Sequence, residues 1–143
     1  MRFNRKNSLL AGLAVAAILA GNPAFAETLK FMADMKGASE VPPNDSAGTG
    51  MGDVTVDTEM KKLTWTVTFS GLSGEPIAAH FHGPAEPGKN AGPVVDISGS
   101  LASGTADITD EQLADLQAGN WYLNVHTEKF PDGEIRGQVE KAQ

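Results

Sequence analysis

The 143 residues carry 11 Lys and Arg against 18 Asp and Glu, a formal net charge of −7 at pH 7. This acidic balance argues against nucleic acid and anionic membrane surfaces as partners, because their phosphate groups would repel the chain. The chain contains no cysteine, which excludes disulfides and thiol chemistry.

Residues 1–26 have the organisation of a secretory signal peptide. Cations among the first six residues precede an apolar run over 9–20, and Ala24-Phe25-Ala26 supplies a small-x-small cleavage site. The apolar run is shorter than the roughly 20 residues that span a bilayer. We therefore expect a periplasmic or secreted protein with no membrane insertion after cleavage. Residues 27–143 form one predicted domain, with 8 Lys and Arg and a formal charge of −10 once the three signal-peptide cations are removed.

The first half of the predicted domain consists of short alternating segments broken by Gly, Pro, Asn and Asp. The pattern predicts a strand over 28–35, a loop over 37–52 with a short pairing near 39–41, and a hairpin between 52–57 and 62–69. The second hairpin arm places four large apolar residues on one face, namely Leu63, Trp65, Val67 and Phe69. Such alternation is typical of an antiparallel sheet with one face on the core.

The middle of the chain predicts another strand over 77–82, followed by a Gly- and Pro-rich loop over 83–93. In that strand Ile77, Ala79 and Phe81 are expected inward, and the intervening histidines outward. A brief apolar run over 94–97 and a strand within 100–108 follow.

One helix is predicted over 109–118. Thr109 and Gln112 have the spacing of a capping box, and Gly119 stands where a glycine commonly ends a helix. We interpret this helix as a crossover between two strands.

Two more strands complete the chain, over 121–126 and 134–140, separated by a turn at 130–133. Alternation places Trp121, Leu123, Val125, Ile135, Gly137 and Val139 inward, and Tyr122, Asn124, His126, Glu134, Arg136 and Gln138 outward. The predicted fold is an all-β antiparallel sandwich or Greek-key barrel of about seven strands with one short helix.

Three segments together resemble the CHRD (chordin-type) domain family in its bacterial, single-domain, exported form. They are Glu40-Val41-Pro42-Pro43, Ala79-His80-Phe81-His82-Gly83-Pro84-Ala85, and the stretch from Gly119-Asn120-Trp121-Tyr122 through Asn124-Val125-His126-Thr127 to Pro131-Asp132-Gly133-Glu134-Ile135-Arg136-Gly137-Gln138-Val139. The resemblance covers essentially the whole of 27–141. It implies a β-rich, immunoglobulin-like fold. It says little about function, although in chordin these domains belong to an extracellular antagonist of growth-factor ligands.

The most informative residues for function are the three histidines, His80, His82 and His126, which are the only ones in the chain. Residues two apart on a strand point to the same face, so His80 and His82 project side by side. If the strand of His126 lies beside them, three imidazoles converge, and such a set suits copper or zinc. Alternatively, the histidines hydrogen-bond the backbone of neighbouring loops and have a structural role.

Three further residues fall on the predicted outer faces: Glu134, Asn124 and Arg136. They are candidates for a fourth ligand or for hydrogen bonds that orient the ligands. Arg136 is an unusual neighbour for a cation and is expected to pair with Glu134 or to bind an anionic group. The His-x-His strand also resembles the copper-ligand strand of Cu,Zn superoxide dismutase. This chain lacks the histidines for a second metal and the disulfide of that enzyme, so we do not expect dismutase activity.

We therefore favour an exported, non-enzymatic protein that binds a transition metal, with copper ahead of zinc. The alternative is an extracytoplasmic module that binds an unknown protein or a glycan through its outer strand face and the loop over 83–93. A redox or hydrolytic enzyme with an open metal position is a third hypothesis. No motif for a serine or cysteine nucleophile is present.

Overall fold

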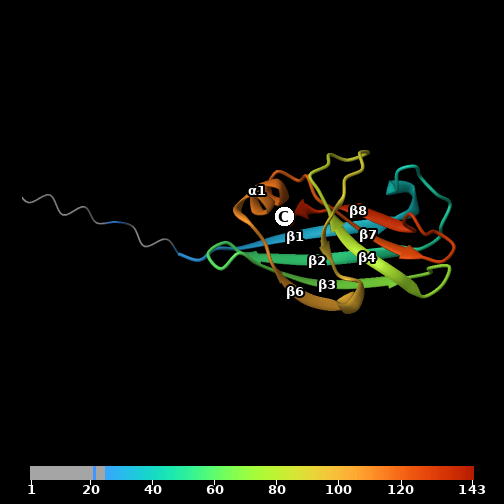
Figure 1. The fold of residues 1–143 in the computed structure, drawn as a ribbon, viewed down its shortest axis with the longest axis horizontal. Coiled ribbons are helices and arrows are strands. Elements are labelled where there is room, and N and C mark those ends of the chain that lie inside the picture. Colours follow the sequence, from blue (N-terminus) through green and yellow to red (C-terminus); the bar gives the residue numbers. More distant parts are fainter. Residues whose placement is uncertain (1–20, 22–24) are drawn as a thin grey trace, which may run out of the picture.

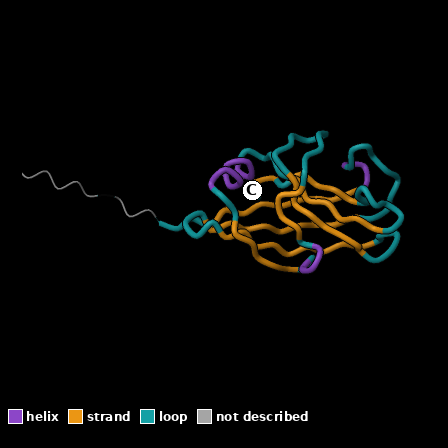
Figure 2. The backbone as a smooth tube through the Cα atoms, viewed as in Figure 1, coloured by secondary structure: helices purple, strands orange, loops and turns teal. Residues whose placement is uncertain are grey.

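The computed structural model describes Gly21 and residues 25–143, so most of the predicted signal peptide, residues 1–26, lies outside the described residues. Figures 1 and 2 show the arrangement of the elements. The strands are β1 (Thr28–Lys36), β2 (Thr49–Asp57), β3 (Lys62–Ser70), β4 (Pro76–His82), β5 (Pro93–Asp96), β6 (Ser103–Asp107), β7 (Tyr122–Thr127), β8 (Ile135–Gln138) and β9 (Glu140–Lys141). The helices are the 3-10 turns η1 (Gly37–Ser39) and η2 (Ser98–Ser100) and the α-helix α1 (Asp110–Gln117).

The strands form one antiparallel sheet that curls into a nearly closed barrel. Their order is β5-β4-β7-β8-β1-β2-β3-β6, and β9 pairs with β1. The turn η2 spans the gap between the two ends of this order. Its Ser98 hydroxyl accepts a hydrogen bond from the Ala79 N–H at 3.1 Å, and the Ser100 carbonyl accepts one from the Trp65 indole at 2.9 Å.

For the described part of the chain, the prediction of an all-β antiparallel fold with one short α-helix is therefore confirmed. Within those residues the sheet has nine strands in place of about seven. Two of them, β5 with 4 residues and β9 with 2 residues, are too short to leave a clear alternation in the sequence.

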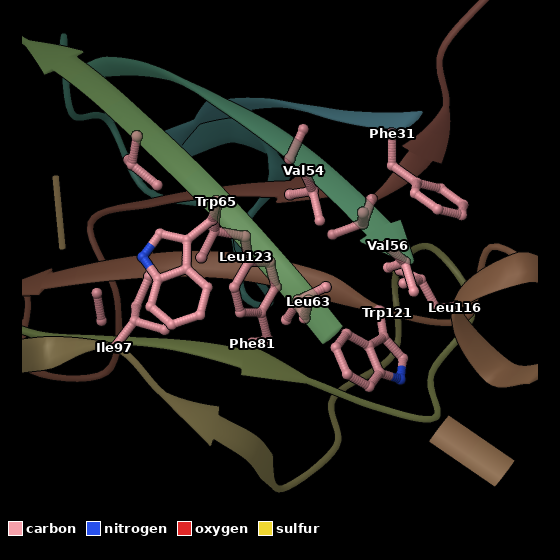
Figure 3. Packing of buried hydrophobic residues seen from close by; sticks show 14 of the residues in the cluster. Phe31, Val54, Val56, Leu63, Trp65, Phe81, Ile97, Leu116, Trp121 and Leu123 are labelled. Carbon is pink, nitrogen blue, oxygen red and sulfur yellow. The ribbon is translucent and has the colours of Figure 1, made fainter. Parts of the chain in front are cut away.

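The core lies inside the barrel and is built from the alternating apolar positions (Figure 3). Trp65 and Trp121, both expected inward, are 2% and 0% exposed and each contact the Phe81 ring, with centroids 6.0 and 5.9 Å apart. Leu123 and Val125 of β7 are fully buried as predicted. Burial of such side chains stabilises a fold by about 1.5–3 kcal/mol each.

Three of the predictions outside the candidate site are wrong. Phe69 is 41% exposed because it is the second-last residue of β3, beyond the buried positions of that strand. Ile77 is 54% exposed because the pairing of β4 with β7 shifts register between Pro76 and Ala78. The chain near 39–41 forms the end of η1 and no strand.

The helix α1 begins as predicted with a reciprocal cap. The Gln112 N–H donates to the Thr109 hydroxyl at 3.1 Å, and the Thr109 N–H donates to the Gln112 side chain at 2.9 Å. Leu113 and Leu116 are buried, and Gly119 follows with a φ of 76°. Figure 1 shows the helix beside the C-terminus of the chain. Neither α1 nor any other helix within the described residues has the length and apolar character needed to cross a membrane.

The outer face of β7 and β8 is covered by loops and not by solvent. Tyr122, Asn124 and Arg136 alternate with core residues, yet they are only 3%, 4% and 2% exposed. The loop over 83–92 covers them, since the Arg136 guanidinium and the Tyr122 hydroxyl both hydrogen-bond to it. This second, polar layer surrounds the histidines.

Candidate metal centre

The neighbouring strands β4 and β7 bring the three histidines to one face. Asn124 pairs opposite His80, and His126 follows it two residues later on the same side of β7. His82 lies two residues beyond His80 on β4, while Phe81 between them is fully buried in the core. The strand alternation read from the sequence therefore places all three rings outside the barrel core.

One ring nitrogen of each histidine lies within 4.8 Å of the other two. His80 Nδ1 is 3.2 Å from His126 Nε2, and the centroid of the His80 ring is 5.4 Å from that of His82. Nitrogen ligands about 2.0–2.1 Å from one ion at tetrahedral angles lie roughly 3.4 Å apart. The His80–His126 pair is therefore close to the required spacing, and the third ring nitrogen lies within 4.8 Å of both.

The tautomers of two rings are fixed by backbone carbonyls. His82 Nδ1 is 2.9 Å from the Ala91 carbonyl oxygen, and His126 Nδ1 is 2.9 Å from that of Pro131. Because a carbonyl oxygen only accepts, each Nδ1 carries the proton. In the neutral rings both Nε2 atoms consequently present a lone pair, which is the form that binds a metal.

These two lone pairs point at the same atom, Asn124 Oδ1. It is 2.9 Å from His82 Nε2 and 3.1 Å from His126 Nε2. The Asn124 side chain is almost completely buried beside the histidines. An oxygen and two or three imidazole nitrogens thus surround one point.

The environment favours neutral imidazoles at pH 7. Burial lowers the pKa of both His80 and His82 below the ordinary value. For His80 the neighbouring His126 adds to this effect, and Asp96 opposes it. Protons therefore compete weakly with a metal ion for these rings near neutral pH.

Asp96 of β5 stands beside His80 on the other side from His126. Its Oδ1 is 3.9 Å from His80 Nε2 and is held by the Ser98 hydroxyl at 2.6 Å. When His80 presents Nδ1 to a metal, its Nε2–H faces this carboxylate. A carboxylate behind a ligating imidazole fixes the ring and increases its basicity.

Arg136 does not pair with Glu134, which is one of the two partners that the sequence predicts for it. Its guanidinium lies 3.5 Å above the Tyr122 ring centre and donates to the Lys89 carbonyl and to Asn90 Oδ1. Tyr122 in turn stacks on His82, with ring centroids 4.6 Å apart. Arg136 therefore holds the loop that orients His82 and offers no ligand atom itself.

Glu134 lies in a different network, away from the predicted outer face. The chain bends at Glu134, and its carboxylate accepts hydrogen bonds from Ser46, Ser73 and Thr127. Burial alone would raise the pKa of Glu134, but these hydrogen bonds outweigh it and leave the pKa below its usual value. The carboxylate is thus engaged in joining two loops, at Ser46 and Ser73, to the end of β7 at Thr127.

Glu40 is a second buried carboxylate, and it lies behind Asn124. It is 6% exposed, and its Oε1 has no hydrogen-bond partner among the described residues. Burial raises its pKa to about 7, against the opposing charge of Arg136 and a hydrogen bond from the Asn124 side chain. This buried acid therefore lies near the amide nitrogen of Asn124, beside Gly133.

Sequence reasoning did not single out Asp96, Tyr122 or Glu40. Asp96 lies on a 4-residue strand whose pairing no pattern revealed. Tyr122 was placed on the outer face, but only its stacking identifies its role. Glu40 belongs to a motif that carried the family resemblance, which was the one available signal.

Comparison with known proteins places the chain in a family. A family model described as the CHRD domain matches residues 31–139, a range that includes all three histidines and Glu40. A curated protein named Chordin, from Danio rerio, is 34% identical over 109 residues, which are 68% of this chain and 12% of that protein. The chain thus spans only a small part of the length of this relative. No solved structure matches. This protein belongs to the CHRD domain family.

Proposed function

We propose that this chain is an exported, non-enzymatic protein that binds one divalent transition-metal ion, copper or zinc, through His80, His82 and His126. The observation that carries the proposal is the convergence of three ring nitrogens within 4.8 Å. Two of the rings also have their opposite nitrogens tied to backbone carbonyls. Such bonds fix the orientation of a ligating imidazole before the metal arrives.

Copper and zinc are the metals that this ligand set suits best. Neutral imidazole is a good ligand for both ions, and Cu(II) binds more tightly than Zn(II) at a given nitrogen site. Ca²⁺ and Mg²⁺ prefer sites made of oxygen atoms, which three imidazoles do not provide. Export to the periplasm or beyond, predicted from residues 1–26, would place the site where it meets extracytoplasmic metal.

A second candidate function is a protein- or glycan-binding module in which the histidines are structural. The same two bonds, from His82 to Ala91 and from His126 to Pro131, favour this alternative because they hold the loops in place. The two candidates differ in one measurable respect, which is whether the purified protein takes up a metal ion.

Isothermal titration of residues 27–143 with Zn(II) and with Cu(II) tests the proposal. We expect one ion per chain at pH 7. His126→Ala removes one of three ligands and should weaken binding by at least about tenfold. Asp53→Asn, which removes an exposed carboxylate from β2, is the matched control and should leave binding unchanged.

Equal losses in both variants would indicate weak binding to the acidic surface instead of a defined site. No binding above background in the unmodified protein would refute the proposal and favour the interaction module.

A further inference from the structure

The carboxamide of Asn124 lies at the centre of the histidine cluster. Its Oδ1 is within hydrogen-bond distance of two ring nitrogens, His82 Nε2 at 2.9 Å and His126 Nε2 at 3.1 Å. Both of those nitrogens carry lone pairs in the neutral rings, because the Nδ1 protons are donated to carbonyls. Three acceptor atoms therefore face one another.

Acceptors that face one another repel unless a hydrogen-bond donor or a cation lies between them. His80 Nδ1, 3.2 Å from His126 Nε2, can donate to that nitrogen, but the contact of His82 Nε2 with Asn124 Oδ1, at 2.9 Å, has no donor when the ring is neutral. A metal ion relieves all of the contacts at once, since each acceptor becomes a ligand. The cluster is thus arranged around a cation.

The orientation of the Asn124 amide is set from behind. A Cβ added at Gly133 would lie 2.3 Å from Glu40 Oε1 and 2.8 Å from Asn124 Nδ2, so these two atoms share one side of the site. The amide nitrogen therefore lies on the Glu40 side of the residue, away from the ring nitrogens that Oδ1 contacts. With the nitrogen held there, the oxygen faces the histidines.

We infer that Asn124 Oδ1 is the fourth ligand of the metal, and that the resulting set of three imidazole nitrogens and one amide oxygen selects Cu(II) or Zn(II) over Cu(I). This inference rests on the proposed function and deepens it. Glu40 is the positioning residue that presents the oxygen.

The selectivity follows from the character of the ligands. Cu(I) prefers soft thiolate and thioether sulfur, whereas carbonyl oxygen is a hard ligand. Neither strand that carries the site, β4 or β7, contains a cysteine or a methionine. A fourth ligand of hard oxygen therefore adds affinity for the divalent ions and little for Cu(I).

Nuclear magnetic resonance of the full mature chain, labelled with ¹³C and ¹⁵N and titrated with one equivalent of Zn(II), tests the inference directly. The Asn124 side-chain ¹³Cγ resonance should shift together with the ring nitrogens of the three histidines. Asn44 and Asn90, which hydrogen-bond to Gly133 and Arg136, are internal controls that should not move.

Two variants extend the test to metal choice. Asn124→Ala should lower Zn(II) and Cu(II) affinity by about tenfold or more, while Cu(I) affinity, measured by competition with a chromophoric chelator, stays nearly constant. The double variant Glu40→Gln with Asn124→Asp exchanges the amide and the carboxylate and should bind Zn(II) more tightly than the wild type, because the ligating oxygen then carries a negative charge. If Asn124→Ala does not fold, this double variant still tests whether an oxygen at position 124 binds the metal.

An unmoved Asn124 ¹³Cγ resonance alongside coordinated histidine rings would overturn this inference and leave the proposed function standing. Absence of any shift at the histidine rings would overturn both. Loss of Zn(II) binding in the folded double variant would also contradict Asn124 as an oxygen ligand.

Discussion

The buried Glu40 carboxylate provides a quantitative test of the polar layer around the site. It is 6% exposed, and one of its oxygens lacks a partner among the described residues. Replacement by Gln keeps the shape and the hydrogen bonding to Asn124 but removes the negative charge that forms at higher pH. We expect Glu40→Gln to stabilise the protein at pH 8.

The size of the effect follows from the pKa of Glu40, which burial raises from 4.5 to about 7. Each pKa unit corresponds to about 1.4 kcal/mol, so the whole shift is worth about 3 kcal/mol. Because the folded state holds the proton more tightly, this stabilisation is fully present below pH 4.5 and is lost as the pH rises to 7. The variant has no carboxyl at this position and therefore lacks this pH-dependent contribution, while its other groups titrate as in the wild type.

Urea unfolding of both proteins in the presence of a metal chelator, at pH 4.5 and at pH 8, measures the difference. The free energy of unfolding of the variant should exceed that of the wild type by about 3 kcal/mol more at pH 8 than at pH 4.5. Glu86→Gln, the same substitution at an exposed position, is the control and should show no such change. Equal differences at the two pH values, or a variant less stable at pH 8, would refute this account of Glu40.

Three further predictions concern the surroundings of the site. Gly133→Ala should destabilise the fold by about 2 kcal/mol or more, because Gly133 has a φ of 129° and the new Cβ would lie 2.3 Å from Glu40 Oε1. Chemical denaturation measures the free energy of unfolding, and an unchanged value would contradict the prediction. Arg136→Met should speed amide hydrogen exchange in the loop over 83–92, to which its guanidinium is bonded, whereas unchanged exchange would show that other contacts hold the loop. Zn(II) affinity should fall between pH 7 and pH 5, because protons then occupy the imidazoles. The fall should begin at a lower pH than for exposed histidines, since burial lowers the pKa of both His80 and His82. Calorimetry at pH 7, 6 and 5 measures the loss, and a constant affinity would argue against imidazole ligands.

The sequence predicted most of the barrel because its strands obey a simple period of two. Trp65, Trp121 and Val125 were all assigned inward from alternation, and all are buried. The capping box of α1 was equally readable, since it depends only on residues three apart. Alternation failed at Ile77, where a shift in strand register moved the residue outward.

The candidate site was only partly predictable, because alternation is a local pattern and does not show which strands pair. Alternation can place His80 and His82 on one face, but only the pairing of β4 with β7 brings His126 beside them. The roles of Asp96 and Glu40 depend on contacts between segments far apart in the chain, which no local pattern reports. Glu134 shows the opposite error, because the bend before β8 turns it away from the face that strict alternation predicts.

The most direct test of the metal site is a crystal structure of the zinc-loaded protein with anomalous scattering data collected at the zinc edge. We predict one anomalous peak, about 2.0–2.1 Å from a ring nitrogen of each of His80, His82 and His126. A peak bound only to surface carboxylates, with the three rings still in their present hydrogen bonds, would contradict the proposed metal centre.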